Sequence, residues 1–446
     1  MPANQGNTMT TEIRKETLRI AGERVGGTQT IEVENPYTNE VVGTVPKATL
    51  ENVRVAFEKA SNYKATLTRF ERSEILRNTA EKLKARRDEI SDLLTAEAGL
   101  CKKDTLYEVG RACDVFSLSA QLLLNDDSQT FSCDISPQGK KRRIYTMRQP
   151  LLGVISAITP FNHPLNQVAH KVAPSIATNN RMVLKPSEKT PLTALLLADI
   201  LYEAGLPPAM FSVITGDPDE IGNELLRNEH IDLITFTGGV SVGHHIADNM
   251  GYRRVVLELG GNAALIVMED ADIDRASTLA VSGAYKNSGQ RCTAVKRILV
   301  HESLADAFVE QVVAKTSAVK YGDPSSEDTQ MGTVIDEDAA RYCEDAVNDA
   351  ISKGAQLLFG HERHGALYSP TVLDRVPYDC QLVHEETFGP VAPIIRFSSI
   401  NEAIQIVNST DFGLSSGVCT NRLDYITQFV EQLEVGTVNV WEVPGY

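Results

Sequence analysis

The sequence predicts an α/β protein with two successive series of strands and helices and one projecting β-hairpin. From Leu151 on, short apolar runs alternate with helical stretches, and a second such series follows Gly261. A polar, alternating segment from Gln129 to Arg148 carries Pro137-Gln138-Gly139 at its centre. The strand–helix–strand order is typical of a parallel sheet with helices on both faces, and polar alternation about a turn is typical of a hairpin.

The N-terminal part is predicted to be helical after a short β-like opening, Ile31 to Val45. Helices are expected from Leu50 to about Leu124, and one of them, Leu106 to Ala120, carries Arg111. Between Arg69 and Leu100 the apolar residues recur at the helical period. They are Ile75, Leu76, Ala80, Leu83, Ile90, Leu93 and Leu94.

The two later series supply the predicted sheets. The first contains four apolar runs of strand type, which are Gly153 to Ile158, Arg181 to Leu184, Phe211 to Ile214 and Leu233 to Phe236. Helical stretches such as Pro191 to Ala204 separate them. The second series starts with Ala263 to Met268 and includes Arg297 to His301. Strands that alternate with helices in this way predict βαβ units.

Composition excludes several classes of partner. A chain of 446 residues is too long for one hydrophobic core, so two or three domains are expected. The formal charge of −16 and the pI of about 5.1 argue against nucleic acid and anionic membranes as partners. An anionic small molecule needs a local cationic pocket, because the protein's overall field opposes it.

The cysteines indicate reduced thiols in a cytoplasmic protein. They are scattered and odd in number, with no C-x-x-C pair: Cys101, Cys113, Cys133, Cys292, Cys343, Cys380 and Cys419. This pattern favours neither a disulfide framework nor a metal site. The segment from Met1 to Arg14 is polar, unlike a signal peptide, and no apolar run approaches the length of a membrane span.

A glycine-rich turn is the candidate for cofactor binding. Thr235 to Gly243 reads T-F-T-G-G-V-S-V-G, follows a predicted strand and opens a predicted helix. Gly238, Gly239 and Gly243 let the backbone approach a pyrophosphate, and the helix N-terminus supplies N–H donors and a positive dipole end. The usual dinucleotide fingerprint G-x-G-x-x-G is absent from the sequence, and two or three glycines before a helix also occur in ordinary turns.

Two short motifs carry the candidate chemistry. Leu257-Glu258-Leu259-Gly260-Gly261-Asn262 places an acid just before a Gly-Gly turn, and Ser288-Gly289-Gln290-Arg291-Cys292-Thr293 places a cysteine in a polar setting. A thiol nucleophile and a carboxylate base are what covalent oxidation of an aldehyde needs. At these residues the chain resembles the aldehyde dehydrogenase superfamily, from about Ile31 to its end. The resemblance implies a Rossmann-type cofactor domain, an α/β catalytic domain and a hairpin used for oligomerisation.

The resemblance also implies the catalytic roles. Cys292 attacks the aldehyde carbon and forms a thiohemiacetal, hydride transfer to a nicotinamide leaves a thioester, and water that Glu258 activates releases the acid. Asn162, in Thr159-Pro160-Phe161-Asn162-His163-Pro164, matches the family's oxyanion-stabilising amide. Two other classes stay open, a dehydrogenase in which coenzyme A resolves the thioester and a silent structural member. Relatives of the first class typically lack the glutamate found here as Glu258.

Further cofactor contacts follow from the resemblance. Lys185, Ser187 and Glu188 match the adenosine-ribose contact, whereas Glu386 and Phe388 match the nicotinamide end. A carboxylate at the ribose accepts bonds from both hydroxyls and repels a 2′-phosphate, so Glu188 favours NAD over NADP.

Three cations suggest an anionic substrate. Arg291 directly precedes Cys292, His163 directly follows Asn162, and Arg111 lies in the region that lines the family's substrate tunnel. Together they suit a phosphonate or phosphate group, so oxidation of phosphonoacetaldehyde to phosphonoacetate is the preferred reading. Alternatives are glyceraldehyde 3-phosphate without phosphorylation, lactaldehyde or a carboxylated semialdehyde. In the structural alternative Arg111 pairs with Glu108 and His163 caps a turn.

The resemblance predicts a domain division and an oligomer. The cofactor domain spans residues 12–128 and 149–257, the hairpin 129–148, and the catalytic domain 258–446. The hairpin predicts a homodimer or homotetramer. The chain stops at Tyr446, where relatives continue through a glycine-rich loop and a final strand, so a missing tail is expected.

Overall fold

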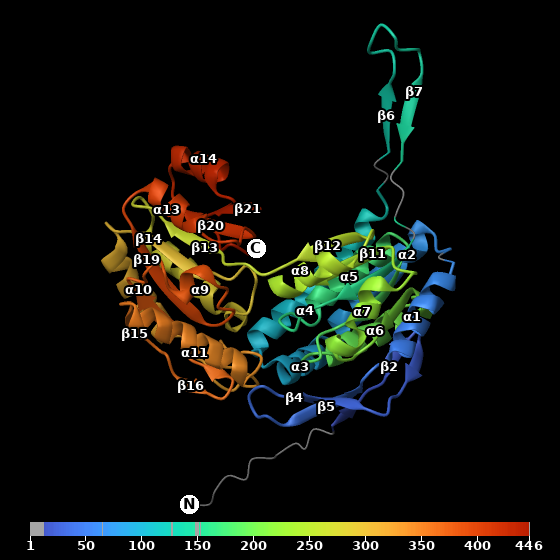
Figure 1. Cartoon of the computed structure of the whole chain (residues 1–446), viewed down its shortest axis with the longest axis horizontal. Helices are drawn as coiled ribbons and strands as arrows, with labels where there is room; N and C mark the ends of the chain where they lie inside the picture. Colours follow the sequence, from blue (N-terminus) through green and yellow to red (C-terminus); the bar gives the residue numbers. More distant parts are fainter. Residues whose placement is uncertain (1–12, 65, 126–127, 148–150, 152, 446) are drawn as a thin grey trace, which may run out of the picture.

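The computed structural model describes residues 13–64, 66–125, 128–147, 151 and 153–445. They form an α/β fold of two lobes, each built on a seven-stranded sheet, with a hairpin that projects from the first lobe (Figure 1). The predicted α/β class is therefore confirmed. The domain limits predicted from the sequence stay predictions, and residues 12, 148, 149 and 446 lie outside the described part.

The first sheet combines a parallel core with an antiparallel edge, in the order β12-β11-β8-β9-β10-β2-β3. Its parallel strands are β8 (Val154–Ile158), β9 (Arg181–Lys185), β10 (Phe211–Val213), β11 (Leu233–Thr237) and β12 (Arg254–Glu258). The strands β2 (Leu18–Ile20) and β3 (Glu23–Val25) extend it antiparallel. The sequence analysis did not expect these two short strands.

Eight helices belong to the described part of the first lobe. They are α1 (Leu50–Asn62), α2 (Arg69–Ala85), α3 (Arg87–Ala98), α4 (Lys102–Leu122), α5 (Asn166–Ala177), α6 (Leu192–Glu203), α7 (Pro218–Arg227) and α8 (Val240–Asn249). The apolar residues predicted to share one side of the Arg69–Leu100 region are all buried in one core. A small sheet of β1 (Arg14–Lys15), β5 (Val41–Pro46) and β4 (Thr30–Glu34) lies below them in Figure 1.

The second lobe repeats the alternation in the order β15-β18-β19-β14-β13-β20-β21. Its strands are β13 (Ala264–Val267), β14 (Arg297–His301), β15 (Gln356–Phe359), β18 (Thr371–Asp374), β19 (Val391–Phe397), β20 (Ser415–Cys419) and β21 (Thr437–Val440), with a small pair β16 (Arg363–His364) and β17 (Leu367–Tyr368). Its helices are α9 (Ile273–Tyr285), α10 (Ala305–Ser317), α11 (Glu337–Ser352), α12 (Gln381–His384), α13 (Ile400–Val407) and α14 (Leu423–Gln432). In the described sheet the edge strand β15 pairs antiparallel with β18, and the other five neighbouring pairs are parallel.

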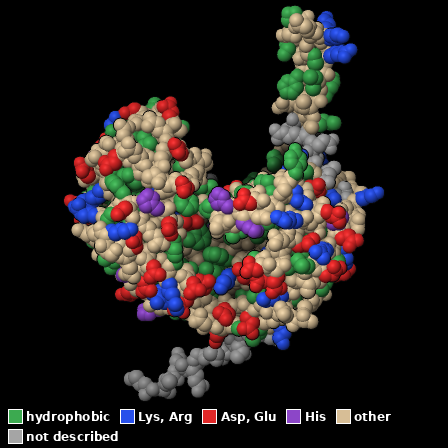
Figure 2. Space-filling model, in the orientation of Figure 1, with side chains coloured by type: hydrophobic (Ala, Val, Ile, Leu, Met, Phe, Trp, Pro, Cys, Tyr) green, Lys and Arg blue, Asp and Glu red, His purple; other side chains and the backbone are tan. Residues whose placement is uncertain are grey.

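The predicted hairpin is present and stands clear of both lobes. β6 (Gln129–Ser132) pairs antiparallel with β7 (Arg143–Thr146), with Thr130 opposite Tyr145. It carries exposed apolar side chains, among them Ile135 at 87% exposure and Tyr145 at 74%. Figure 2 shows hydrophobic atoms along it and in the hollow between the lobes. Among the described helices, none is long and apolar enough to cross a membrane.

The sheet geometry gathers the site at one edge. The parallel strands β8, β9, β11 and β12 lead into the Asn162 turn, Lys185, the glycine turn and Glu258 respectively. Because the carboxyl ends of parallel strands share an edge, these segments lie together where the second lobe faces the first.

Candidate active site

A strained turn presents the predicted nucleophile, Cys292. Three consecutive residues before it, Asn287, Ser288 and Gly289, have left-handed φ angles of 60°, 54° and 73°. A Cβ at Gly289 would lie 2.2 Å from the carbonyl oxygen of Gly389, so that position requires glycine. Strained backbone of this kind persists only where the surrounding structure holds it, and it is common at active sites.

Glu258 and Cys292 line the same cavity, which has a volume of about 570 Å³. Glu258 is the last residue of β12, and its backbone carbonyl accepts a hydrogen bond from the Gly238 N–H at 3.0 Å. Burial raises the pKa of the Cys292 thiol, and the nearby charge of Lys296 opposes that shift. The predicted base and nucleophile therefore line one cavity.

Asn162 is tied to the loop that carries Cys292. Its side chain is buried, and Nδ2 donates to the backbone carbonyl of Gln290 at 2.8 Å. Its own backbone carbonyl accepts a bond from Asn287 Nδ2 at 3.0 Å. Asn162 and Cys292 also line a smaller cavity of about 210 Å³. The structure thus brings all three predicted catalytic residues to connected walls of one site.

Lys171 is a site residue that the sequence analysis missed. It lines the cavity of Cys292 and Glu258, and its Nζ donates to the hydroxyls of Thr235 and Thr237, each at 2.9 Å. Burial lowers the pKa of Lys171 to about 8, although the charge of Glu258 opposes the shift. A lysine within the apolar stretch of α5 was the available signal, since a buried lysine requires polar partners.

The predicted adenosine-ribose residues line a cavity of about 720 Å³ together with the glycine turn. Lys185, Ser187 and Glu188 lie in its wall, and Lys185 Nζ is 3.2 Å from a Glu188 carboxylate oxygen. Gly239 precedes the first turn of α8 and makes no side-chain cap, and a Cβ there would meet open space. The first N–H groups of α8 are therefore available to an anionic ligand.

Gly243 has a different place from the one predicted. It is buried within α8, and a Cβ there would lie 2.5 Å from the Leu259 side chain. Gly243 does not belong to the wall of the 720 Å³ cavity. Its lack of a side chain allows α8 to pack against the segment after β12, and its predicted role in cofactor binding stays a prediction.

Glu386 and Phe388, which are predicted to hold the nicotinamide end, line the 210 Å³ cavity together with Cys292. One Glu386 oxygen accepts hydrogen bonds from the Gly261 N–H at 3.1 Å and from Lys296 Nζ at 2.9 Å. Phe388 has a left-handed φ of 49° and packs edge-to-face with Phe161, with ring centroids 5.9 Å apart.

The three predicted substrate cations have separate neighbours. His163 Nδ1 lies 3.5 Å from Glu108, whose other oxygen accepts the backbone N–H groups of Leu165 and Asn166 at 2.9 Å. Arg111 is half-buried on α4 and acts electrostatically on His170, as His163 does. The expected alternative pairing of Arg111 with Glu108 is therefore wrong, because Glu108 caps α5 and faces His163.

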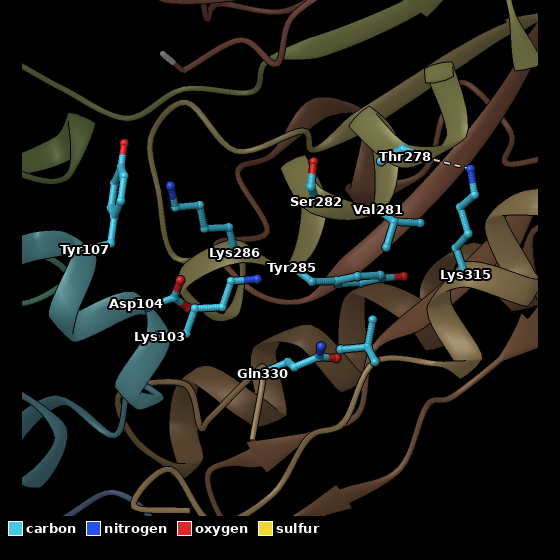
Figure 3. A pocket seen from close by; sticks show the side chains of 11 residues that line it. Lys103, Asp104, Tyr107, Thr278, Val281, Ser282, Tyr285, Lys286, Lys315 and Gln330 are labelled. Carbon is cyan, nitrogen blue, oxygen red and sulfur yellow. Dashed lines mark hydrogen bonds between the residues drawn. The ribbon is translucent and has the colours of Figure 1, made fainter. Parts of the chain in front are cut away.

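Arg291 is buried, and its Nη2 donates to the Gly283 carbonyl at 3.0 Å. Burial lowers the pKa of Arg291, and the charge of Asp104 on α4 opposes the shift. Asp104 also lines a cavity of about 530 Å³ between α4 and α9, where Lys286 lies 3.4 Å from the centre of the Tyr107 ring (Figure 3). Each of the three cations thus interacts with a different residue of α4 or α5: His163 with Glu108, Arg111 with His170, and Arg291 with Asp104.

Comparison with known proteins identifies the family. Residues 24–446 match the sequence model of the protein family described as "Aldehyde dehydrogenase family". The chain is 37% identical to 3-sulfolactaldehyde dehydrogenase of Priestia megaterium over 98% of its length and 92% of the relative's. It is 37% identical to NADP-dependent glyceraldehyde-3-phosphate dehydrogenase of Streptococcus equinus over 94% and 89% of the two chains.

A solved structure shares the fold over nearly the whole chain. Aldehyde dehydrogenase 21 from Physcomitrella patens, in complex with the reaction product succinate, is 36% identical with a TM-score of 0.93 and covers 98% of this chain and 91% of its own. The fold is that of an oxidoreductase that acts on aldehydes. The chain belongs to the aldehyde dehydrogenase family, and its activity is that of an NAD(P)-dependent aldehyde dehydrogenase.

Proposed function

We propose that the protein oxidises a small aldehyde that carries an anionic group at its far end, with three-carbon 2-hydroxyaldehydes as the preferred class. The two relatives described above act by name on 3-sulfolactaldehyde and glyceraldehyde 3-phosphate, which share a 2-hydroxyl and an anionic C3 substituent. They support the alternatives raised from the sequence better than phosphonoacetaldehyde, which becomes one test substrate among several.

The observation that carries the catalytic proposal is the shared cavity of Cys292 and Glu258, with Asn162 bonded to the same loop. Cys292 Sγ adds to the aldehyde carbon, and the Asn162 amide and the Cys292 N–H stabilise the developing oxyanion. Bound cofactor supplies the hydride acceptor. The thioester left on Cys292 is then open to water, from which Glu258 takes a proton.

Lys171 supports Glu258 in this scheme. Its ammonium group lines the same cavity and interacts with the charge of Glu258, the carboxylate that takes the proton from water. The hydroxyls of Thr235 and Thr237 hold the ammonium in place. Because the pKa of Lys171 is lowered to about 8, the group carries its charge at neutral pH and loses it in mild alkali.

We propose NAD as the preferred cofactor, although the family includes users of both NAD and NADP. The residues fit a dinucleotide, since the open glycine turn and the uncapped start of α8 suit a pyrophosphate. Glu188 lies in the wall of the same cavity, where its carboxylate accepts ribose hydroxyls and repels a 2′-phosphate. Glu386 and Phe388 would hold the nicotinamide end next to Cys292.

Steady-state oxidation of a substrate panel tests the proposed class. The panel holds 3-sulfolactaldehyde, glyceraldehyde 3-phosphate, phosphonoacetaldehyde, succinic semialdehyde and uncharged lactaldehyde, each with NAD. We expect kcat/KM for the first two to exceed that for lactaldehyde by about 10-fold or more, the yield of one charge-assisted contact. Equal values for charged and neutral aldehydes would remove the anion pocket and leave the dehydrogenase.

Two variants locate the anion pocket. Arg111→Ala and Arg291→Gln should lower kcat/KM for the charged aldehydes more than for lactaldehyde, because each removes a cation near the site. Arg77→Ala is the matched control, since Arg77 is exposed and pairs with Glu74 on the same helix. If the two site variants lose activity equally on charged and neutral substrates, these arginines support the fold and do not bind the head group.

We also propose a homodimer or homotetramer that uses the hairpin. Apolar side chains such as Phe131 and Ile144 are exposed there at 50% and 56%, a cost that a partner chain would remove. Replacement of both by serine should shift the mass measured by light scattering toward the monomer. An unchanged mass would mean that another surface holds the oligomer.

A further inference from the structure

Lys296 is a buried lysine that none of the roles above uses. It follows Cys292 by four residues, lies just before β14 and has a side chain only 3% exposed. Its Nζ has two polar partners, the Arg291 carbonyl oxygen at 2.5 Å and a Glu386 carboxylate oxygen at 2.9 Å. It also lies 4.9 Å from the centre of the Phe388 ring. One ammonium group thus contacts the nucleophile loop and both residues of the nicotinamide end.

The contact with the Arg291 carbonyl has a chemical consequence. That oxygen belongs to the peptide unit whose nitrogen is the N–H of Cys292. A cation bound to the oxygen withdraws electron density through the conjugated amide and makes the N–H more positive, so it becomes a stronger donor. In the proposed mechanism this N–H faces the oxyanion. The same charge also favours the thiolate form of Cys292, since Lys296 is the largest of the influences that lower the pKa of that thiol.

Glu386 sets how much of this charge Cys292 experiences. The Lys296–Glu386 pair keeps the ammonium in the interior, where burial alone lowers the pKa of Lys296 and the carboxylate opposes that shift. Glu386 is nearer the solvent than Lys296, with 18% of its side chain exposed, and it raises the pKa of Cys292 where Lys296 lowers it. The carboxylate therefore retains the cation and partly offsets its effect on the thiol.

We propose that Lys296 is a positioning residue that activates Cys292 twice, by polarising the Arg291–Cys292 peptide toward the oxyanion and by stabilising the thiolate. The oxyanion half rests on the proposed function, because it assumes that the Cys292 N–H meets the oxyanion. The thiolate half does not need any dehydrogenase activity.

Alkylation of the full-length protein with iodoacetamide, without cofactor, tests the thiolate half. The Cys292 sulfur displaces iodide, and mass spectrometry of the Cys292 peptide gives the rate between about pH 6 and 10. Lys296→Met should raise the apparent pKa of Cys292 by about one unit, which slows alkylation about 10-fold below that pKa. Lys296→Arg, which keeps the charge, should stay close to the wild type.

The control variant is Lys315→Met. Lys315 is a lysine whose ammonium is fully bonded, but its partners Asp274, Ser277 and Thr278 all lie on α9 and not on the Cys292 loop. It should leave the alkylation profile unchanged. An unshifted profile in Lys296→Met, or an equal loss in Lys296→Arg, overturns the proposal. If Lys296→Met does not fold, Lys296→Gln answers instead: its amide can still donate to the Arg291 carbonyl but carries no charge, so alkylation must again slow below the apparent pKa of Cys292, and an unchanged rate contradicts the proposal.

The oxyanion half is measured with 4-nitrophenyl acetate. The Cys292 thiolate forms a carbon–sulfur bond to the acetyl carbon, 4-nitrophenolate leaves, and no cofactor takes part. At neutral pH, each acylation rate is divided by the alkylation rate of the same protein, which corrects for the fraction of thiolate. Lys296→Met should then still acylate about 10-fold more slowly, because the oxyanion donor is weaker. Equal corrected rates would refute the polarised N–H. A wild type that oxidises no aldehyde would instead count against the proposed function, since both cofactor-free rates remain measurable.

Discussion

The two sides of Cys292 differ in what sets their geometry. On the cofactor side the predicted residues line two cavities, one with Glu188 and the glycine turn and the other with Glu386 and Phe388. On the substrate side the predicted cations each have a local partner, such as Glu108 for His163. Glycine turns and the order of strands can be predicted from the sequence. The partners of long charged side chains cannot, because tertiary packing decides which groups lie within reach.

The largest expected effect comes from the group that both sides share. Cys292→Ala should lower aldehyde turnover by about 10⁴-fold or more, because among the described residues no other thiol lines the cavity wall with Glu258. NAD affinity, measured by calorimetry, should change by less than about threefold, since a small side chain is removed from a large binding surface. Cys133→Ala on the hairpin is the control. Residual turnover near the wild-type rate would mean that the covalent route is wrong.

The next prediction separates structural from substrate charges. Glu108 is 2% exposed and accepts two backbone N–H groups at the start of α5. Glu108→Ala leaves these donors buried and unpaired, so it should lower the free energy of unfolding by about 2–3 kcal/mol in urea titrations.

The preference of Glu108→Ala for anionic aldehydes should not fall, because the substitution frees His163 from a negative partner. Glu74→Ala, which removes an exposed ion pair, should change the stability by less than about 0.5 kcal/mol. A stable Glu108→Ala protein that has lost its preference for anions would reverse our view of this side.

Six strands of the two sheets and the nucleophile loop were predicted because their signals are local. Apolar runs of strand length define β8 to β11, β13 and β14, and the Ser288–Thr293 motif fixes the polar setting of Cys292. β12 was not among the predicted strands. The strands β2 and β3 were missed because three-residue strands with ordinary composition carry no periodic signal. Lys171 and Lys296 were missed for another reason: their burial depends on contacts with segments far away in the sequence, namely β11 and Glu386.

The pH dependence of Lys171→Met tests whether the missed lysine acts through its charge. Below about pH 8 Lys171 is protonated, and its charge interacts with Glu258. Above that pH the wild type loses the charge, so it then resembles the variant, which lacks the charge at every pH. The variant should therefore be slower by about 10-fold at neutral pH, the effect of one lost charge-assisted interaction in the cavity. The kcat values of the wild type and the variant, measured from neutral pH to above pH 8, should converge at the alkaline end. A ratio of the two kcat values that does not change with pH would mean that the variant loses packing and not charge.

The smallest expected effect concerns the choice of cofactor. Glu188 is 41% exposed and already lies 3.2 Å from Lys185, so solvent and that cation both weaken its repulsion of a 2′-phosphate. Glu188→Gln should shift the ratio of kcat/KM for NAD to that for NADP by only about fivefold, or roughly 1 kcal/mol, toward NADP.

Asp219→Asn decides what such a shift means. Asp219 lines the same cavity from the first turn of α7, so it adds a similar charge without occupying the ribose position predicted for Glu188. If both variants shift the ratio equally, the overall charge of the cavity selects the cofactor, and the position of the Glu188 carboxylate does not matter. If only Glu188→Gln does, the carboxylate acts by its position at the end of β9, and the contrast between the two sides of Cys292 extends to cofactor choice.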